Sequence, residues 1–200
     1  MAKPTLYILA GGRSKRFGSD KARAVVEGQT LLQRVAAALA PVTDACIVVA
    51  AEAEAYSDLG FETLGDTRHS HGPLGGLETA LEHHTSNAEP GWIALASCDL
   101  LDPKPEHLAK LIEQTQVTHD ADPVAVVFET DRPQPFPGLY HTAALARVKT
   151  GLAEQKPWGM IRLLRSLNAL LLPAPDDWPT IPQANRRDRF DAWKNEQEQT

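Results

Sequence analysis

Apolar runs of strand length alternate along this chain with segments of helical periodicity, and this alternation restricts the possible folds more than any other feature. The first run spans Thr5 to Ala10, and later ones span Ala45 to Ala51 and Trp92 to Ala96. Between the first two, apolar residues recur at helical spacing after Thr30, a plausible N-cap, until Pro41 ends the segment. Alternating strands and helices form mainly parallel sheets covered on both faces. We therefore expect a three-layer α/β/α fold with a mostly parallel central sheet.

The rest of the chain continues this pattern less regularly. Further strands are expected at Phe61–Leu64, Pro123–Phe128 and Ala169–Leu172. One helix is expected to end near His84, and others are expected at Pro103–Gln116, Thr142–Leu152, Trp158–Leu167 and Asp188–Gln197. Arg132 to Gly138 contains three prolines and is expected to form a loop or a broken hairpin, because proline cannot donate to a central ladder. No repeat or low-complexity linker divides the chain, so residues 1–200 are interpreted as a single domain.

Composition narrows the class of protein. With 42% hydrophobic and 23% charged residues the chain is typical of a soluble globular domain, and its net charge of −6 argues against general nucleic-acid binding. Cys46 and Cys98 lie far apart in apolar runs, as expected of buried reduced thiols in a cytosolic protein. No apolar run approaches membrane-spanning length and no signal peptide is evident, so we expect a cytoplasmic protein without a membrane partner.

A glycine-containing basic loop follows the first expected strand. It begins Gly11-Gly12-Arg13-Ser14-Lys15-Arg16 and continues through Gly18 to Lys21. Glycines let a polyphosphate approach backbone amides, the Arg16 guanidinium offers several donors to phosphate oxygens, and Lys21 supplies a compact charge. The spacing matches neither a Walker loop nor a dinucleotide fingerprint. From charge and glycine content alone, phosphate binding and an ordinary solvated loop are about equally well supported.

Two other segments are expected at the same end of the sheet, since ligands of open α/β sheets collect at the carboxyl ends of the strands. One is Asp66 to Gly76, and the other is Ser97-Cys98-Asp99, which follows a buried strand. Asp99 is placed where Mg²⁺ bound to a nucleotide would lie. A helix N-cap or a turn residue is an equally good interpretation of this aspartate from its spacing alone.

Together these motifs resemble a known family. The stretch from Leu9 to Lys21 closely resembles the opening signature of nucleotidyltransferases of the GT-A-like, Rossmann-like fold, and within them it is most similar to the molybdenum cofactor guanylyltransferases. Asp66 with Gly72-Pro73-Leu74-Gly75-Gly76, then Cys98-Asp99, and then Gln183-Ala184-Asn185 follow in the family's order. The resemblance covers nearly the whole chain and implies a GT-A-like nucleotidyltransferase domain.

The resemblance also implies roles for individual residues. Arg16, Lys21 and Asp99 would be the catalytic residues, and Asp99 would hold Mg²⁺, with Asn185 as a possible second contact near the metal. The nucleotide would be bound by a larger set, namely Leu9, Ala10, Gly11, Gly12, Arg16, Lys21, Asp66, Gly72, Pro73, Leu74 and Asp99. These residue types suit nucleotidyl transfer, which requires positioning and charge stabilisation without a covalent nucleophile. The attacking group is already an anionic phosphate, so no catalytic histidine is expected.

The implied reaction joins the terminal phosphate of Mo-molybdopterin to the GMP part of GTP, with Mg²⁺ assistance, and releases pyrophosphate. GTP and Mo-molybdopterin are thus the expected partners, and cofactor hand-off proteins or molybdoenzyme chaperones are further candidates. The alternatives are a cytidylyltransferase on the same cofactor, a nucleotidyltransferase on another small phosphorylated acceptor, and a catalytically silent nucleotide-binding member. Ala50 departs from the asparagine that guanylyl members usually carry after the second strand, which keeps the choice of base open. A dehydrogenase is disfavoured because the glycine spacing is wrong.

Two other groups of residues invite a functional interpretation. Four histidines lie close in sequence without nearby cysteine ligands, so surface or substrate-loop histidines are favoured over a transition-metal site; they are His69, His71, His83 and His84. Cations gather between Thr142 and Asn168, at Arg147, Lys149, Lys156, Arg162 and Arg165, with only Glu154 opposing them. Such a segment could attract the anionic acceptor, but solvated helix faces or pairing with neighbours are somewhat better supported.

Overall fold

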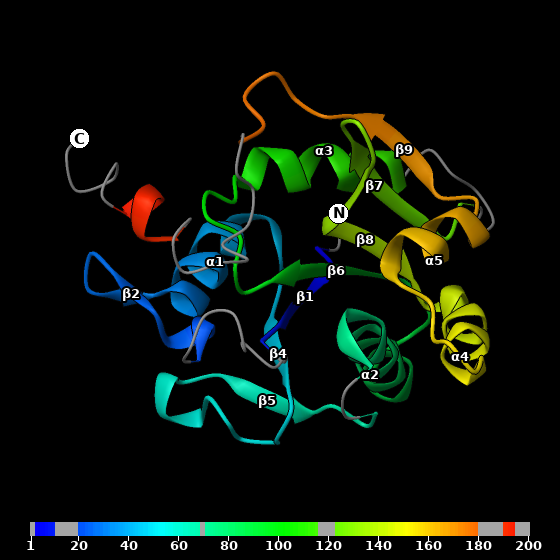
Figure 1. Ribbon diagram of the computed structural model, residues 1–200, viewed down its shortest axis with the longest axis horizontal. Coiled ribbons are helices and arrows are strands. Elements are labelled where there is room, and N and C mark those ends of the chain that lie inside the picture. Colours follow the sequence, from blue (N-terminus) through cyan, green and yellow to red (C-terminus); the bar gives the residue numbers. More distant parts are fainter. Residues whose placement is uncertain (1–2, 11–19, 69–70, 116–122, 180–189, 195–200) are drawn as a thin grey trace.

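A computed structural model gives the chain a three-layer α/β/α architecture (Figure 1) and describes residues 3–10, 20–68, 71–115, 123–179 and 190–194. Within these residues seven strands form one sheet, in the order β5-β4-β1-β6-β8-β7-β9. The strands are β1 (Thr5–Leu9), β4 (Cys46–Ala50), β5 (Glu62–Gly65), β6 (Trp92–Ser97), β7 (Ala125–Glu129), β8 (Pro133–His141) and β9 (Leu170–Pro173). The expected α/β fold is therefore confirmed.

The strand β1 lies at the centre of the parallel half of the sheet. It pairs in parallel with β4 on one side and with β6 on the other, and β4 pairs in parallel with β5. Leu6 and Ile8 of β1 are fully buried, as are Val48 and Ala94 on its neighbours. Burial on both faces explains why these strands are almost uninterruptedly apolar. Because the four strands run in the same direction, their carboxyl ends share one edge of the sheet.

The proline-containing segment belongs to β8, which runs antiparallel to both of its neighbours in the described sheet, β6 and β7. Of the two forms expected for residues 132–138, the broken hairpin is confirmed, because the register of the β7–β8 hairpin shifts between Val127 and Phe128. The strand β6 pairs with Gly138 to His141, so the prolines precede the part of β8 that lies between two strands. A missing N–H is tolerated at such a position.

Helices cover both faces of the sheet. The helices α1 and α3 pack on one face, and α2, α4 and α5 pack on the other (Figure 1). Their bounds are α1 (Leu31–Leu39), α2 (Gly72–Asn87), α3 (Pro105–Thr115), α4 (Leu145–Ala153) and α5 (Met160–Ser166), with the short 3-10 helices η1 (Lys21–Arg23), η2 (Ala40–Val42), η3 (Ser57–Leu59) and η4 (Thr142–Ala144). Of the terminal helix expected at 188–197, residues 190–194 are described and are helical. Among the described residues, none of the helices has the length and apolarity that a membrane span requires.

The start of α1 follows its sequence signal. The Thr30 hydroxyl accepts a hydrogen bond from the Gln33 N–H, and the Gln33 side chain accepts one from the Thr30 N–H, which is a capping box. Just before the helix, β2 (Val25–Val26) and β3 (Gln29–Thr30) form a small antiparallel hairpin. This hairpin connects η1 to α1.

A small satellite core holds the C-terminal helix against this region. Phe190 and Trp193 pack with Val26, Leu31 and Leu101. Since Val26 follows η1 and Leu101 follows β6, the cluster joins two segments that lead away from the same edge of the sheet. Residues 190–194 are therefore part of the support of that edge.

The segment after β9 is tied to α3 by one carboxylate. Asp177 lies 2.8 Å from both Lys104 Nζ and His107 Nε2. Hydrogen bonds from these two partners, with Lys104 the stronger influence, lower the pKa of the Asp177 carboxyl well below its usual range. Trp178 stacks on the His107 ring with 5.5 Å between the centroids. The chain after the last strand is thus fixed on the face that α3 covers.

Candidate active site

The carboxyl ends of the parallel strands hold several loops side by side. The Cys98 N–H donates to the Leu9 carbonyl at 3.1 Å, and the Asp66 N–H donates to the Ala50 carbonyl at 2.7 Å. These bonds continue the ladders beyond the last residues of the strands. They bring the segments after β1, β5 and β6 to one edge, as the sequence analysis expected.

Lys21 and Asp99 form the centre of this edge. The Lys21 Nζ lies 2.5 Å from Asp99 Oδ2, although 78 positions separate the two residues in the chain. The Ser97 hydroxyl donates to the other carboxylate oxygen, Oδ1. The side chains of Asp99 and Lys21 are only 4% and 18% exposed. The carboxylate is therefore buried with a hydrogen-bond donor on each oxygen and one balancing charge, as a buried ion requires.

The local structure excludes the helix N-cap interpretation of Asp99 and agrees with the turn interpretation. The residue lies in a turn directly after β6, and α3 begins only at Pro105. Asp99 therefore does not cap that helix, and its carboxylate binds the side chains of Lys21 and Ser97 instead. A buried acid at the end of a central strand is available for chemistry at the sheet edge.

The Cys98 thiol lies beside this pair but is poorly suited to act as a nucleophile. Burial above all, with a contribution from the charge of Asp99, raises the pKa of Cys98 to about 12. Nucleophilic attack needs the thiolate, so a covalent cysteine intermediate is disfavoured at neutral pH. Both cysteines are free thiols, as expected; Cys98 is buried, whereas Cys46 is only partly buried.

A network around Tyr56 fixes the backbone that carries Lys21. Asp20 caps η1 by accepting a hydrogen bond from a backbone N–H of that helix. The Tyr56 hydroxyl donates to Asp20 Oδ2 at 3.0 Å, and burial together with the charge of Asp20 raises the pKa of Tyr56, so it remains a donor. Arg23 lies over the Tyr56 ring at 5.2 Å and pairs with Asp58 at 2.8 Å. Sequence reasoning missed this network because only the fold brings Tyr56 next to Asp20.

The segment from Asp66 leads into the N-terminus of α2. The Asp66 carboxylate accepts a hydrogen bond from the Arg68 N–H at 2.9 Å, and Gly72 begins the helix with a φ of +63° that favours glycine. Pro73 follows in the first turn, where its missing N–H costs no helical hydrogen bond, and Leu74 is buried. Asp66, Gly72, Pro73 and Leu74 thus lie where β5 ends and α2 begins.

Two glycines let α2 approach the end of β1 closely. A Cβ on Gly76 would lie 2.8 Å from a methyl carbon of Leu9, and a Cβ on Gly75 would lie 3.2 Å from Asp66 Oδ1. Side chains at these positions would push the helix away from the strand. The Gly-Gly pair of the motif therefore sets the distance between the Asp66 segment and the loop after β1.

Arg68 is a cation at this edge that the sequence analysis did not select. Its Nε donates to Glu78 Oε2 at 2.7 Å. The Glu78 side chain is 2% exposed, whereas that of Arg68 is 41% exposed. A buried carboxylate of α2 thus holds an exposed arginine beside Asp66. No sequence motif marks the pair, because it depends on how α2 packs.

The structure brings most of the predicted residues together. Leu9, Ala10, Lys21, Asp66, Gly72, Pro73, Leu74 and Asp99 lie at the described edge, whereas Gly11, Gly12, Arg16 and Asn185 lie outside the described residues. Among the residues that the structure describes, no group of three or more His, Cys, Asp or Glu side chains could by itself hold a metal ion. A cation held by Asp99 would therefore take further ligands from the substrate and from water.

The basic segment between Thr142 and Asn168 lies away from the Lys21–Asp99 edge. In Figure 1, α4 and α5 are on the right, whereas β2, which begins four residues after Lys21, is on the left. Lys149 pairs with Glu82 at 2.8 Å, and Arg162 pairs with Glu154 at 3.1 Å. Arg162 also lies 4.6 Å from the centre of the Trp158 ring. The structure therefore favours pairing with neighbours over acceptor binding for Lys149 and Arg162.

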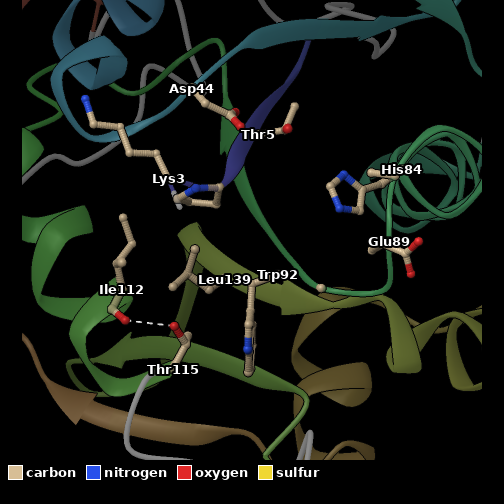
Figure 2. A pocket seen from close by; sticks show the side chains of 12 residues that line it. Lys3, Thr5, Asp44, His84, Glu89, Trp92, Ile112, Thr115 and Leu139 are labelled. Atoms are coloured by element: carbon tan, nitrogen blue, oxygen red, sulfur yellow. Dashed lines mark hydrogen bonds between the residues drawn. The ribbon is translucent and has the colours of Figure 1, made fainter. Parts of the chain in front are cut away.

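A pocket of about 480 Å³ opens at the opposite edge of the sheet, where β1 and β6 begin. Figure 2 shows His84 and Glu89 on one side of this pocket, with Leu139 and Trp92 near its middle. The neighbouring His83 lies 2.9 Å from the Tyr7 hydroxyl. This pocket and its histidines are separate from the Lys21–Asp99 edge.

Comparison with known proteins agrees with this geometry. A family model described as MobA-like NTP transferase domain matches residues 6–170. A probable molybdenum cofactor guanylyltransferase of Deinococcus radiodurans is 41% identical over 148 residues, which cover 74% of this chain and 72% of that protein. A protein of the same name from Bacillus cereus is 28% identical and covers 89% of this chain and 90% of its own length.

A solved structure shows the same fold. The crystal structure of molybdopterin-guanine dinucleotide biosynthesis protein A from Archaeoglobus fulgidus superposes with a TM-score of 0.79. The alignment covers 98% of this chain and 100% of that one, with 20% sequence identity. The likeness extends over the whole sheet and both layers of helices.

Proposed function

This chain belongs to the MobA-like NTP transferase family, and on that premise we propose that it transfers GMP from GTP to the terminal phosphate of Mo-molybdopterin, giving molybdopterin guanine dinucleotide and pyrophosphate. As a member of the family it is a nucleotidyltransferase of molybdenum cofactor biosynthesis. The names of its relatives support GTP as the nucleotide and molybdopterin as the acceptor.

The buried Lys21–Asp99 pair is the observation that carries this proposal. A nucleoside triphosphate arrives as a polyanion with a divalent cation, and it needs a protein cation for its phosphates and a carboxylate for the metal. Lys21 and Asp99 supply one of each at the end of the central strands. The segments from Leu9 and from Asp66 border the same edge and would enclose the nucleotide.

The proposed reaction is a direct displacement. An oxygen of the acceptor's terminal phosphate forms a bond to the α-phosphorus of GTP, and the bond from this phosphorus to the oxygen that bridges to the β-phosphate breaks. Pyrophosphate leaves with the electron pair, and the attacking oxygen is already anionic, so no residue has to take up a proton. Lys21 would bind the α-phosphate and offset the negative charge there.

The donor set at Asp99 suits Mg²⁺. This ion usually takes one or two carboxylates and completes its coordination with water and substrate phosphates, so the single buried carboxylate at this point of the described edge is sufficient. Asp99 would hold the ion, and Ser97 would orient the carboxylate through its hydrogen bond to Oδ1. When bound, Mg²⁺ supplies positive charge to the phosphate oxygens.

A cytidylyltransferase on the same cofactor is the second candidate, because Ala50 leaves the choice of base open. This residue ends β4 and is 3% exposed. Its methyl group offers neither a donor nor an acceptor where guanylyl members usually carry an asparagine. Base selection would then depend on backbone groups and on other side chains of the edge.

The test is a base-selective transfer assay. The protein is incubated with Mo-molybdopterin, Mg²⁺ and each labelled nucleoside triphosphate in turn, and label in the cofactor is measured. We expect label from GTP, and we expect Asp99→Asn to abolish the release of pyrophosphate while circular dichroism stays unchanged. Labelling from CTP in preference to GTP would overturn the guanylyl assignment, and turnover by the folded Asp99→Asn variant would show that Asp99 is not the metal ligand.

A further inference from the structure

The ion pair at the centre of the site occupies the carboxylate that a metal ion would need. Lys21 Nζ lies 2.5 Å from Asp99 Oδ2, and the Ser97 hydroxyl binds Oδ1. With 4% of its side chain exposed, Asp99 has little room for further partners. An ammonium group and a divalent cation cannot both bind Oδ2 at such short range, because their charges repel each other.

We propose that Lys21 competes with the divalent cation for Asp99, so that the cation binds more tightly once nucleotide phosphate has drawn the Lys21 ammonium away. The inference rests on the proposed function, in which Asp99 binds the cation and Lys21 binds a phosphate. It adds an order to those events, since the triphosphate binds before the protein–metal contact or together with it.

The surroundings of Lys21 permit this exchange. Its backbone belongs to η1, which Asp20 caps and which the Tyr56 hydroxyl holds through Asp20. Only the four-carbon side chain has to turn, and it is 18% exposed, so its head can reach a ligand at the edge. The exchange moves one charged group and leaves the fold in place.

The electrostatics couple the two binding events. A buried carboxylate that loses its balancing charge is strongly unfavourable. Among the described residues Lys21 is the cation paired with Asp99, so it leaves readily only if another cation replaces it. Binding of nucleotide and binding of metal to the protein therefore strengthen each other, and this effect is reciprocal. Because of this pair, neither Mg²⁺ alone nor nucleotide alone forms the full set of contacts with Asp99 and Lys21.

Binding of Mn²⁺ in the absence of any nucleotide tests this proposal, with the electron paramagnetic resonance signal of free Mn²⁺ as the readout. We expect Lys21→Met to bind one Mn²⁺ at least about fivefold more tightly than the wild type, within the usual range of coupling between sites. The gain should vanish in the double variant Lys21→Met with Asp99→Asn. Lys149→Met is the matched control, because it removes the same charge from an exposed pair with Glu82, and it should leave Mn²⁺ binding unchanged.

Three results would overturn the proposal: no gain in Lys21→Met, an equal gain in Lys149→Met, or a gain that persists without Asp99. If Lys21→Met does not fold, Lys21→Gln serves instead, since its amide can still donate to Asp99 and a smaller gain is expected. Neither GTP nor the acceptor takes part in this measurement. A gain in Mn²⁺ affinity in Lys21→Met, together with a wild type that transfers no nucleotide, would refute the proposed function alone. A wild type that transfers GMP, together with no gain in Lys21→Met, would refute the exchange alone.

Discussion

Replacing Lys21 by Met should destabilise the protein through Asp99 rather than through lost packing. The methionine keeps the apolar stem, but the carboxylate, 4% exposed, loses its balancing charge and retains Ser97 as its other described partner. Breaking a buried pair in this way costs about 3–5 kcal/mol. We expect the lower end, about 3 kcal/mol, because Lys21 is 18% exposed and the pair borders solvent. For a chain of this size that corresponds to a fall in Tm of about 6–12 °C.

The double variant Lys21→Met with Asp99→Asn separates destabilisation by an unbalanced Asp99 charge from destabilisation by lost packing. Removing both charges leaves an amide that Ser97 can still bind, so the double variant should recover to within about 1 kcal/mol of the wild type. The assay is urea unfolding at pH 7 with a chelator present, followed by far-ultraviolet circular dichroism, and the coupling between the substitutions is read from the full cycle. Additive losses in the double variant would refute the claim that an uncompensated buried carboxylate causes the destabilisation.

Three further predictions concern other contacts. Ser97→Ala should lower kcat and weaken Mn²⁺ binding in the presence of GTP, and it should cost about 1–3 kcal/mol in urea unfolding because a buried carboxylate oxygen loses its donor; a normal metal affinity would contradict a positioning role. Asp177 has a lowered pKa in the folded state, so its contribution to stability is present above its unfolded pKa, about 3.9, and is lost as the pH falls below that value. The difference in Tm between wild type and Asp177→Asn should therefore shrink from pH 6 to pH 2, and a constant difference would refute this assignment. Gly138→Ala should cost about 1–3 kcal/mol, because its Cβ would lie 2.8 Å from the Pro135 carbonyl oxygen; unchanged urea unfolding would refute that close approach.

Much of the fold could be predicted because the strands of the parallel half are buried on both faces. Burial makes Leu6–Leu9 and Val48–Ala50 continuously apolar, and such runs are visible without any knowledge of their neighbours. The proline segment was ambiguous for a physical reason. Prolines at 133, 135 and 137 are compatible with a strand only because β6 pairs further along, from Gly138, and this register is a property of the sheet.

The site was predictable to the extent that its residues lie directly after strands. Asp66 and Asp99 follow β5 and β6 within two residues, so topology alone brings them to one edge, whereas Lys21 was found through the loop motif that follows β1. Which charged side chains pair with each other was not predictable, because this depends on side-chain packing across the sheet. The pairing of Lys21 with Asp99 and of Arg68 with Glu78 joins residues 78 and 10 positions apart, and no local pattern encodes either contact.

The charge arrangement of the edge explains why Lys21 is the group suited to exchange. Lys21, Arg23 and Arg68 each face a carboxylate in the described structure, so these cations are held in place within a protein of net charge −6. Arg23 binds Asp58 through two nitrogens, and the planar guanidinium makes such a pair geometrically specific. The Arg68 guanidinium is held by a carboxylate inside α2. In the described part of the chain Lys21 pairs with Asp99 alone and has a flexible side chain, and Asp99 is the acid for which a metal ion can compete. Binding of a polyanion can therefore release this one cation without disturbing the pairs that hold the edge together.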